Sequence, residues 1–259
     1  MNAVPPRTMT ARVESDCVGM RALESVIWRS FLCQGWRNLS APRRRVNHLR
    51  PARPLRARPA NAKWGAMTAP SASRLALVTG ASRGLGFAIA AALGVRGWHV
   101  VAVGRTVGGL EELDDRISAA GGTATLAPMD VTDRGAMEHL AASIGARWGG
   151  LGLWVHSAIQ AAPLSPASHI DAKEMEKSVA TNLRAPAALI PLLDPLLRVA
   201  GGTALFLDDP RAGEKFFGTY GATKAAQIAL ARSWQAESAR IGPRVVIATP
   251  RPMPTATRA

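Results

Sequence analysis

The chain has 259 residues, 47% of them hydrophobic, which is enough for one sizeable α/β domain and an appended segment. It holds no run of about 18 uncharged apolar residues, which excludes an ordinary membrane-spanning helix. Both cysteines, Cys17 and Cys33, lie near the N-terminus, so the remainder has no disulfide framework. The net charge of +14 comes mostly from residues 1–66, with 13 Lys and Arg against 3 acidic residues. We therefore expect a cytoplasmic protein with a basic N-terminal extension.

Residues 41–66 combine blocks of arginine with repeated prolines, a composition that cannot bury apolar surface and predicts disorder. Three interpretations of residues 1–66 stay open. The one that we favour is that the natural product begins at Met67, shortly before the first strand. The others are a basic arm for RNA or a membrane surface, and an Arg-rich transit segment, against which the acidic residues count. We expect neither a membrane nor a nucleic acid as a partner.

From Met67 onward, apolar β-rich runs alternate with helical patterns. The first expected pairs of strand and helix are 75–79 with 85–95, 99–103 with 110–120, and 123–128 with 133–147, where Asp133 is suited to be the N-cap. The later pairs are 151–155 with a long helix 171–198, bent near Pro186, then 203–207 with 219–240, and a last strand 244–247. Strands that are apolar throughout predict a parallel sheet covered on both faces. Residues 67–259 are therefore predicted to form a doubly wound Rossmann domain, three-layer α/β/α, with about six strands.

The most informative segment is Gly80-Ala-Ser-Arg-Gly84-Leu-Gly86, which lies between the first strand and the first helix. Glycines here permit a tight turn, close approach of the backbone to a phosphate, and close packing of helix on strand. The helix N-terminus adds free N–H groups and a partial positive charge. A purely structural turn is the alternative, but the position at the start of a βαβ unit favours a dinucleotide site.

Charge near the second strand indicates which dinucleotide binds. A site selective for NAD keeps a carboxylate at the end of that strand for the ribose 2′-OH. Here the strand ends at Val103-Gly104-Arg105, and the next acid is Glu111. Arg83 in the glycine turn and Arg105 could together clamp a 2′-phosphate. The predicted cofactor is therefore NADP.

Tyr220 and Lys224 are spaced four residues apart on one predicted helix, so the ammonium of Lys224 is expected near the Tyr220 oxygen. A phenol with a pKa of about 10 transfers protons poorly at neutral pH, and an adjacent cation lowers that pKa. Tyr220, the only tyrosine of the chain, could then act as a general acid or base at a carbonyl or alcohol. The alternative is an ordinary helix that happens to carry both residues.

These motifs resemble the short-chain dehydrogenase/reductase family, particularly its members that are similar to 3-oxoacyl-carrier-protein reductases, over residues 73–255. The resemblance rests on Thr79–Gly86, Asp130-Val131, Asn182 and the Tyr220–Lys224 segment. It implies that Asp130-Val131 contact adenine and that Asn182 supports a proton relay. The cofactor-binding residues that we then expect are Gly80, Ser82, Arg83, Gly84, Leu85, Gly86, Arg105, Asp130, Val131, Ala158, Tyr220, Lys224 and Thr255.

The position of the family's catalytic serine is occupied differently. Here the fifth strand is followed by Asp208-Asp209, and Asp209 takes the serine position. An ionised Asp209 would raise the pKa of Tyr220 and could not donate a hydrogen bond to a substrate, whereas a protonated Asp209 could donate one. Thr219 could supply a hydroxyl instead, or the serine role could be empty.

Other motifs also depart from the family pattern. The family's Asn-Asn-Ala-Gly reads His156-Ser157-Ala158-Ile159, in which His156 is expected to be a hydrogen-bonded structural substitute. The family's Pro-Gly reads Pro250-Arg251, although Thr255 keeps a threonine expected to contact the cofactor amide. The chain ends at Ala259, so we expect neither a seventh strand nor the usual substrate loop.

These features lead to an NADP-dependent oxidoreductase that transfers hydride between nicotinamide and a carbonyl or secondary alcohol. Its expected catalytic residues are Tyr220, Lys224, Asn182 and Asp209, and no metal site is predicted. The alternative is an NADP-binding family member with little or no activity, acting as a regulatory or partner subunit. By analogy with the family, a homodimer is expected through the helices 171–198 and 219–240.

Overall fold

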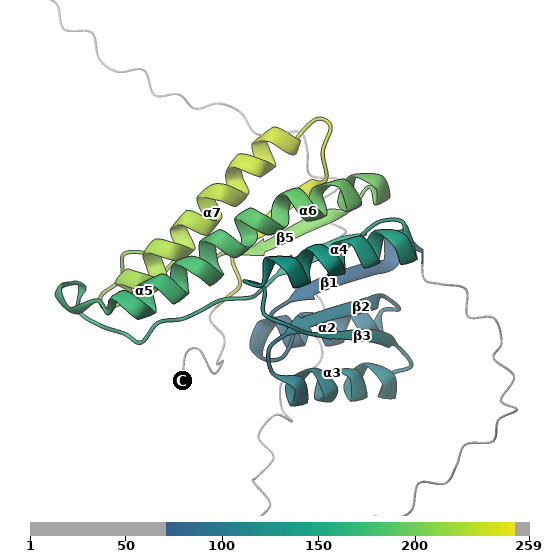
Figure 1. The fold of residues 1–259 in the computed structure, drawn as a ribbon, viewed down its shortest axis with the longest axis horizontal. Coiled ribbons are helices and arrows are strands. Elements are labelled where there is room, and N and C mark those ends of the chain that lie inside the picture. Colours follow the sequence, from purple (N-terminus) through teal and green to yellow (C-terminus); the bar gives the residue numbers. More distant parts are fainter. Residues whose placement is uncertain (1–70, 252–259) are drawn as a thin grey trace, which may run out of the picture. The chain divides into compact units, whose positions relative to one another are not determined.

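The computed structural model describes residues 71–251 (Figure 1). The predictions made for residues 1–66 and for Thr255 lie outside the described residues. In the described part, all predicted strands and helices are present, so the expectation of a Rossmann domain is confirmed.

Six parallel strands form one sheet in the order β3-β2-β1-β4-β5-β6. The strands are β1 (Leu75–Thr79), β2 (His99–Gly104), β3 (Thr123–Pro128), β4 (Leu153–His156), β5 (Thr203–Leu207) and β6 (Arg244–Ala248). Every residue of β1, β2 and β4 is buried, which explains why these strands are mostly apolar. The strand order reverses between β1 and β4, where ligands bind in folds of this type.

The main helices are α2 (Gly84–Val95), α3 (Val107–Ala119), α4 (Arg134–Trp148), α5 (Ala172–Val179), α6 (Ala185–Ala200) and α7 (Gly218–Ser238). Short 3-10 turns lie at Ala72–Arg74 and Ala167–His169. Helix α2 packs against α3, and α4 packs against α6. The largest core cluster joins side chains of α4, α6 and α7 to the sheet, including Ile144, Leu193, Trp234, Trp154 and Phe206.

The N-cap predicted for α4 is confirmed, because the carboxylate of Asp133 accepts a hydrogen bond from the N–H of Ala136 at 3.0 Å. The predicted long helix 171–198 is interrupted elsewhere than expected. A π-helical turn at Ala180–Arg184 separates α5 from α6, whereas Pro186 lies in the first turn of α6, where proline is tolerated. The π turn carries Asn182, which is fully buried.

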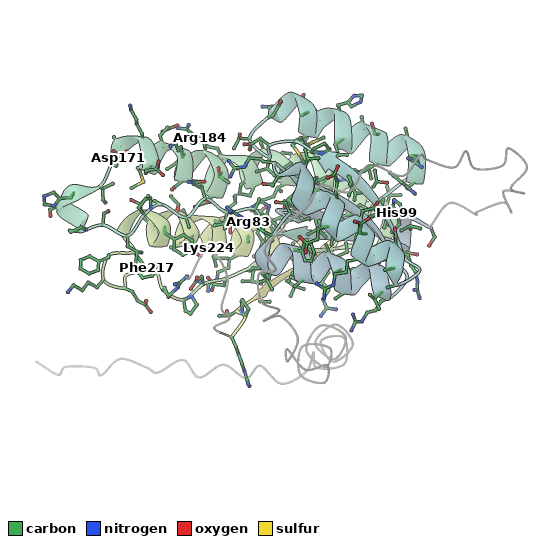
Figure 2. The ribbon with its side chains drawn as sticks, turned by 90° about the horizontal axis from the view of Figure 1, so that it is seen from below. Arg83, His99, Asp171, Arg184, Phe217 and Lys224 are labelled. Atoms are coloured by element: carbon green, nitrogen blue, oxygen red, sulfur yellow. The ribbon has the colours of Figure 1, made fainter. Side chains whose placement is uncertain are left out.

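The loops before α5 and α7 lie at the same end of the domain. Figure 2 shows Asp171, the N-cap of α5, and Phe217, which precedes α7, together at the end away from His99. A backbone hydrogen bond of 3.2 Å from the N–H of Ser165 to the carbonyl of Phe216 joins the two loops. The two loops are therefore joined at this end of the domain.

Candidate active site

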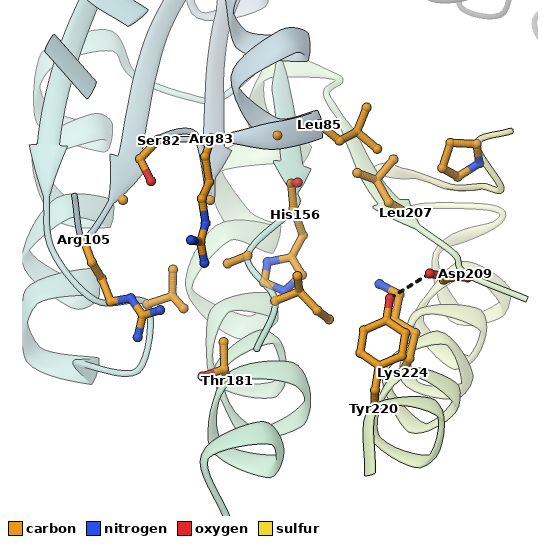
Figure 3. Close-up of a pocket in the computed structure, with 18 of the residues that line it drawn as sticks. Ser82, Arg83, Leu85, Arg105, His156, Thr181, Leu207, Asp209, Tyr220 and Lys224 are labelled. Carbon is orange, nitrogen blue, oxygen red and sulfur yellow. Dashed lines mark hydrogen bonds between the residues drawn. The ribbon is translucent and has the colours of Figure 1, made fainter. Parts of the chain in front are cut away.

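A cavity of about 470 Å³ opens at the carboxyl ends of β1, β2, β4 and β5 (Figure 3). Arg83 and Arg105 lie on one side of it, Asp209 and Tyr220 on the other, and His156 between them. The predicted site residues that line the cavity are Gly80, Ser82, Arg83, Gly84, Leu85, Arg105, Asp130, Val131, Ala158, Asp209, Tyr220 and Lys224. The fold thus brings most of the predicted site together.

At its glycines, the glycine turn leaves the backbone close to the cavity. Gly80 and Gly84 have φ values of +81° and +61°, which side-chain-bearing residues rarely adopt. A Cβ on Gly86 would lie 2.2 Å from the carbonyl oxygen of Gly80, so only glycine fits there. Helix α2 begins at Gly84 with no side-chain cap, which leaves its first N–H groups available to an anion.

Two arginines approach the cavity beside this turn. Arg83 precedes α2 and is exposed, and Arg105 follows β2 with a side chain that is 57% exposed. The guanidinium of Arg105 lies 3.6 Å from the carboxylate of Asp130, which also accepts hydrogen bonds from the backbone and hydroxyl of Thr132. Asp130 therefore orients Arg105, while much of the Arg105 guanidinium stays exposed to solvent and can make further hydrogen bonds.

Asn182 lies outside the cavity lining. Its side-chain oxygen accepts a hydrogen bond from the N–H of Gln160 at 2.7 Å, and its Nδ2 donates to the Gln160 carbonyl and to the hydroxyl of Thr223, both at 2.9 Å. Asn182 therefore ties the loop after β4 to α7. Gly86, at the end of the glycine turn, likewise does not line the cavity.

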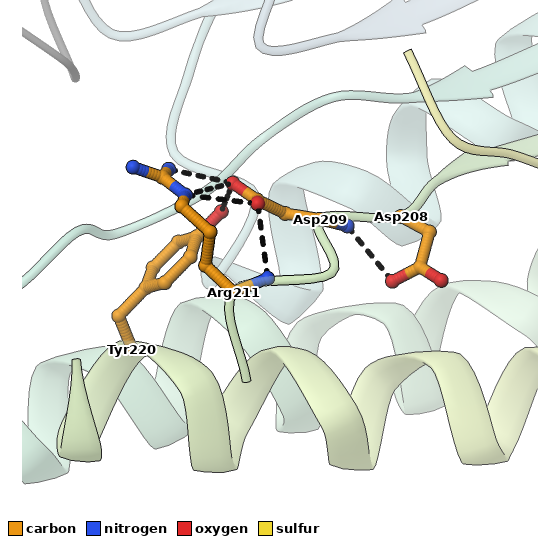
Figure 4. A network of polar contacts seen from close by, with 4 residues as sticks. All are labelled: Asp208, Asp209, Arg211 and Tyr220. Atoms are coloured by element: carbon orange, nitrogen blue, oxygen red, sulfur yellow. Dashed lines mark hydrogen bonds and ion pairs between the residues drawn. The ribbon is translucent and has the colours of Figure 1, made fainter. Parts of the chain in front are cut away.

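Tyr220, Asp209 and Arg211 form one polar cluster (Figure 4). The Tyr220 hydroxyl donates to Asp209 Oδ2 at 3.0 Å. Both carboxylate oxygens of Asp209 accept hydrogen bonds from Arg211, with 2.9 Å and 3.1 Å to Nε and 2.6 Å to Nη2. The Arg211 guanidinium also lies 4.6 Å from the centre of the Phe217 ring and 5.7 Å from that of Tyr220. The three charged or ionisable groups therefore share one hydrogen-bonded arrangement.

The pKa values in this cluster follow from these contacts. Burial acts to raise the pKa of Asp209, but hydrogen bonds from Arg211 and Tyr220 outweigh it and hold the pKa at about 2. Burial, followed by the charge and hydrogen bond of Asp209, raises the pKa of Tyr220 well above its usual value, while Arg211 acts to lower it. Asp209 is thus ionised at neutral pH, the first of the two states considered above.

Lys224 makes a buried hydrogen bond that the sequence did not predict. Among the described residues, its ammonium donates a hydrogen bond to Oε1 of Gln227 at 2.6 Å and none to Tyr220. Gln227 lies three residues further along α7 and is fully buried, so it offers Lys224 an acceptor where water is scarce. Burial lowers the pKa of Lys224 to about 8, although Asp208 and Asp209 act in the opposite direction.

His156 is buried and hydrogen-bonded, which agrees with the structural role expected of it. Its Nδ1 lies 2.9 Å from the hydroxyl of Thr79, and its ring packs against Trp154 and Phe206. Burial, together with the charge of Lys224, lowers its pKa to about 3. The imidazole is therefore neutral at physiological pH.

Sequence reasoning missed Arg211, which is the main partner of Asp209. The available signal was a basic residue two positions after an acid that takes the serine position. Thr219, considered as a source of a hydroxyl, is buried and does not line the cavity. Further lining residues that were not predicted are Gly104, Thr106, Met129, His156, Ser157, Ile159, Thr181, Leu207, Asp208, Pro250 and Arg251.

Within residues 71–251, no helix is both long and apolar enough to cross a membrane. The same part of the chain contains no group of three or more His, Cys, Asp or Glu side chains arranged to hold a metal ion.

Comparison with known proteins places this site in context. The family model for short chain dehydrogenase matches residues 74–259. A fatty acyl-CoA reductase of Mycobacterium tuberculosis is 31% identical over 171 residues, 62% of this chain and 56% of that protein. A tropinone reductase homologue of Arabidopsis thaliana is 32% identical over 174 residues, 66% of this chain and 65% of that protein. The chain therefore spans less than two thirds of either curated relative.

A solved structure shares the fold and holds a cofactor. It is a metagenomic short-chain oxidoreductase in complex with NADP, 28% identical to this chain, with a TM-score of 0.65. The match covers 71% of this chain and 84% of that one.

Proposed function

The chain belongs to the short-chain dehydrogenase family, and from this premise we propose that it is an NADP-dependent oxidoreductase acting on a carbonyl or secondary alcohol. The observation that carries the proposal is that the glycine turn, Arg105 and Tyr220 border one cavity of about 470 Å³. Such an arrangement brings an anion site and an acid/base side chain within the span of a single dinucleotide and its substrate.

The described residues fit the pyrophosphate of a dinucleotide. A Cβ on Gly84 would meet nothing within 4 Å, so open space lies directly over the N-terminus of α2. The free N–H groups there would hold the pyrophosphate, and Asp130 and Val131 would border the adenine. Ala158, which lines the same cavity, would allow the nicotinamide ribose to approach β4 closely.

The preference for NADP is argued from charge. Arg83 and Arg105 both border the cavity, and residues 104–110 contain no carboxylate that would pair with a ribose 2′-OH. Asp130 lies near Arg105, but a 2′-phosphate carries more charge than the carboxylate and would compete for the guanidinium. The NADP complex of the related metagenomic oxidoreductase supports the same choice.

The chemistry assigned to the chain is proton transfer beside the nicotinamide. The bound nicotinamide supplies or accepts hydride. Tyr220, whose hydroxyl borders the cavity, would give its proton to the substrate oxygen during reduction and take it back during oxidation. Asn182 would hold α7 and the loop after β4 in register rather than touch the substrate, because it lies outside the lining.

The full-length chain tests the proposal in two steps. Binding of NADPH and NADH is measured by the change in nicotinamide fluorescence, and we expect NADPH to bind at least about tenfold more tightly. Oxidation of bound NADPH is then followed with a panel of ketones, aldehydes and acyl thioesters. Equal affinity for the two cofactors would contradict NADP selectivity, and no oxidation with any carbonyl would contradict the assigned reaction.

A second candidate function is favoured by one observation. The Tyr220 hydroxyl already donates to an ionised carboxylate, which makes the phenol a weak acid at neutral pH. An NADP-binding subunit with little or no turnover would keep this cluster unchanged. It predicts normal NADPH binding in the first step above and no turnover in the second.

We also propose that the protein is a cytoplasmic homodimer. Ala222, Ala225 and Ala229 give α7 an exposed face of small side chains, which permits close approach of a second helix. Light scattering of the full-length chain after size exclusion tests this, with twice the chain mass expected. A variant with Ala225→Arg should return the mass to that of a single chain.

A further inference from the structure

The ammonium of Lys224 takes part in a set of buried hydrogen bonds that does not include the Tyr220 hydroxyl. Lys224 Nζ donates to Gln227 Oε1 at 2.6 Å, and Gln227 Nε2 donates to the backbone carbonyl of Asn182 at 2.9 Å. Lys224, Gln227 and Asn182 are all buried, with exposed fractions of 6%, 0% and 0%. A side-chain amide therefore fixes Lys224 against the π turn, and the arrangement leaves the Tyr220 oxygen to other partners.

Arg211 lies beside Tyr220 and is held by hydrogen bonds and by a ring contact. Its guanidinium makes hydrogen bonds to both oxygens of Asp209, and it stacks on the Phe217 ring at 4.6 Å. Its side chain is only 20% exposed, although it borders the open cavity. Figure 4 shows the guanidinium beside the Asp209 oxygen that accepts the hydrogen bond from the Tyr220 hydroxyl.

We propose that Arg211, anchored by Asp209 and Phe217, is the positioning residue that supplies positive charge to Tyr220 in this chain, in place of Lys224. The inference rests on the proposed function, in which Tyr220 transfers a proton. It deepens that function by assigning the cation that controls the transfer.

The proton balance requires such a cation. When Tyr220 gives its proton to the substrate oxygen, the O–H bond of the phenol breaks and its electron pair stays on the phenolate. The new O–H bond completes the alcohol. The phenolate then lies beside the carboxylate of Asp209, and two adjacent negative charges are unfavourable unless a fixed cation contacts them. Arg211 already makes hydrogen bonds to that carboxylate beside the Tyr220 ring, and it stays charged over the whole working range of pH.

The sign of each charge effect on Tyr220 agrees with this placement. The charge of Arg211 acts to lower the pKa of Tyr220, whereas the charge and hydrogen bond of Asp209 raise it. The pKa of Lys224 is itself lowered to about 8, so part of its charge is lost in mildly alkaline solution.

The single tyrosine of the chain makes a direct experiment possible. A trifluorinated tyrosine, which is more acidic than tyrosine, can replace Tyr220 throughout the full-length protein by biosynthetic incorporation. The fluorine resonance then reports the ionisation of this one residue. We expect Arg211→Gln to raise the titration midpoint by about one pH unit, a tenfold fall in the ionisation constant. Arg211→Lys should raise it less, and Lys224→Gln should raise it by under half as much as Arg211→Gln.

The proposal would be overturned if Lys224→Gln raised the titration midpoint more than Arg211→Gln did. It would also be overturned if Arg211→Gln left the midpoint unchanged or lowered it. Circular dichroism establishes whether each variant is folded. If Arg211→Gln is unfolded, Arg211→Lys alone is used. A raised titration midpoint is then expected, and an unchanged midpoint would contradict the proposal. The titration needs neither substrate nor turnover. A failure of the proposed reaction therefore leaves the fluorine result readable, and the two failures are distinguishable.

Discussion

The two ends of the cavity differ in how closely they follow the family pattern. At the cofactor end, the turn from Gly80 to Gly86 keeps the expected glycines, and their backbone geometry agrees with an anion site. At the catalytic end, Tyr220 donates a hydrogen bond to the carboxylate of Asp209, where the family pattern leads one to expect a serine, and Lys224 donates to Gln227. The difference teaches that a phosphate site made of backbone depends on one local segment. A proton-transfer site made of side chains depends on which of several partners each side chain finds.

The largest expected effect tests the catalytic end. Tyr220→Phe removes the proposed acid and keeps the ring, so turnover should fall by about 100- to 10,000-fold in an NADPH oxidation assay. NADPH affinity, measured on the same protein, should change by less than about twofold because the pyrophosphate site is untouched. Turnover equal to that of the wild type would show that Tyr220 is not the acid/base group.

The next effect tests the cofactor end. Gly86→Ala places a methyl group 2.2 Å from the carbonyl oxygen of Gly80, so the turn must shift. Overpacking of this kind destabilises by about 1–3 kcal/mol, and we expect NADPH to bind about 100-fold more weakly by fluorescence titration. Gly108→Ala is the matched control, because a Cβ there meets nothing within 4 Å. Equal behaviour of the two variants would refute the role given to the turn.

A smaller effect sharpens the cofactor end further. Arg83→Ala and Arg105→Ala should each weaken NADPH binding by about tenfold, because each removes a charge-assisted hydrogen bond, and should leave NADH binding nearly unchanged. The control is Arg134→Ala, an exposed arginine that pairs with Glu138 on α4 and does not line the cavity. Loss of NADH and NADPH affinity in equal measure would point to the pyrophosphate rather than the 2′-phosphate.

The last effect is on stability and concerns His156, which lies between the two ends. Its folded pKa of about 3 is below its ordinary value of 6.5, so between these values the unfolded chain binds a proton that the folded chain excludes. The free energy of unfolding should therefore fall as pH drops through this window, by up to about 1.4 kcal/mol per pH unit from this group.

Urea unfolding of the wild type and of His156→Asn from about pH 6.5 to 4.5 measures that contribution. Other titrating groups, such as His99, are shared by both proteins and cancel in the difference. The wild type should lose more stability than the variant over this range. If the unfolding free energies of the two proteins changed in parallel with pH, His156 would take up its proton equally in the folded and unfolded states.

The order of elements and the cofactor end could be predicted from the sequence because each depends on local pattern. Apolar runs indicate which segments are buried strands, and the glycines between 80 and 86 permit the positive φ values and the close backbone approach that this turn needs. The π turn around Asn182 could not be predicted in this way. The residues around Asn182 are of ordinary helical types and give no signal for a π turn. Pro186, which suggested a bend, lies in the first turn of α6, where proline is tolerated.

The sequence by itself determined the Rossmann fold, the glycine turn and the presence of Tyr220 four residues before Lys224 on one helix. Only the tertiary structure decided the partners of these side chains. Tyr220 meets Asp209 and Arg211 because the loop after β5 folds back over α7, and Lys224 meets Gln227 because both are buried against Asn182. The physical reason is that a buried charge pairs with whatever polar group packing leaves beside it, and burial is set by contacts between segments distant in sequence, such as that of Gln227 with Asn182.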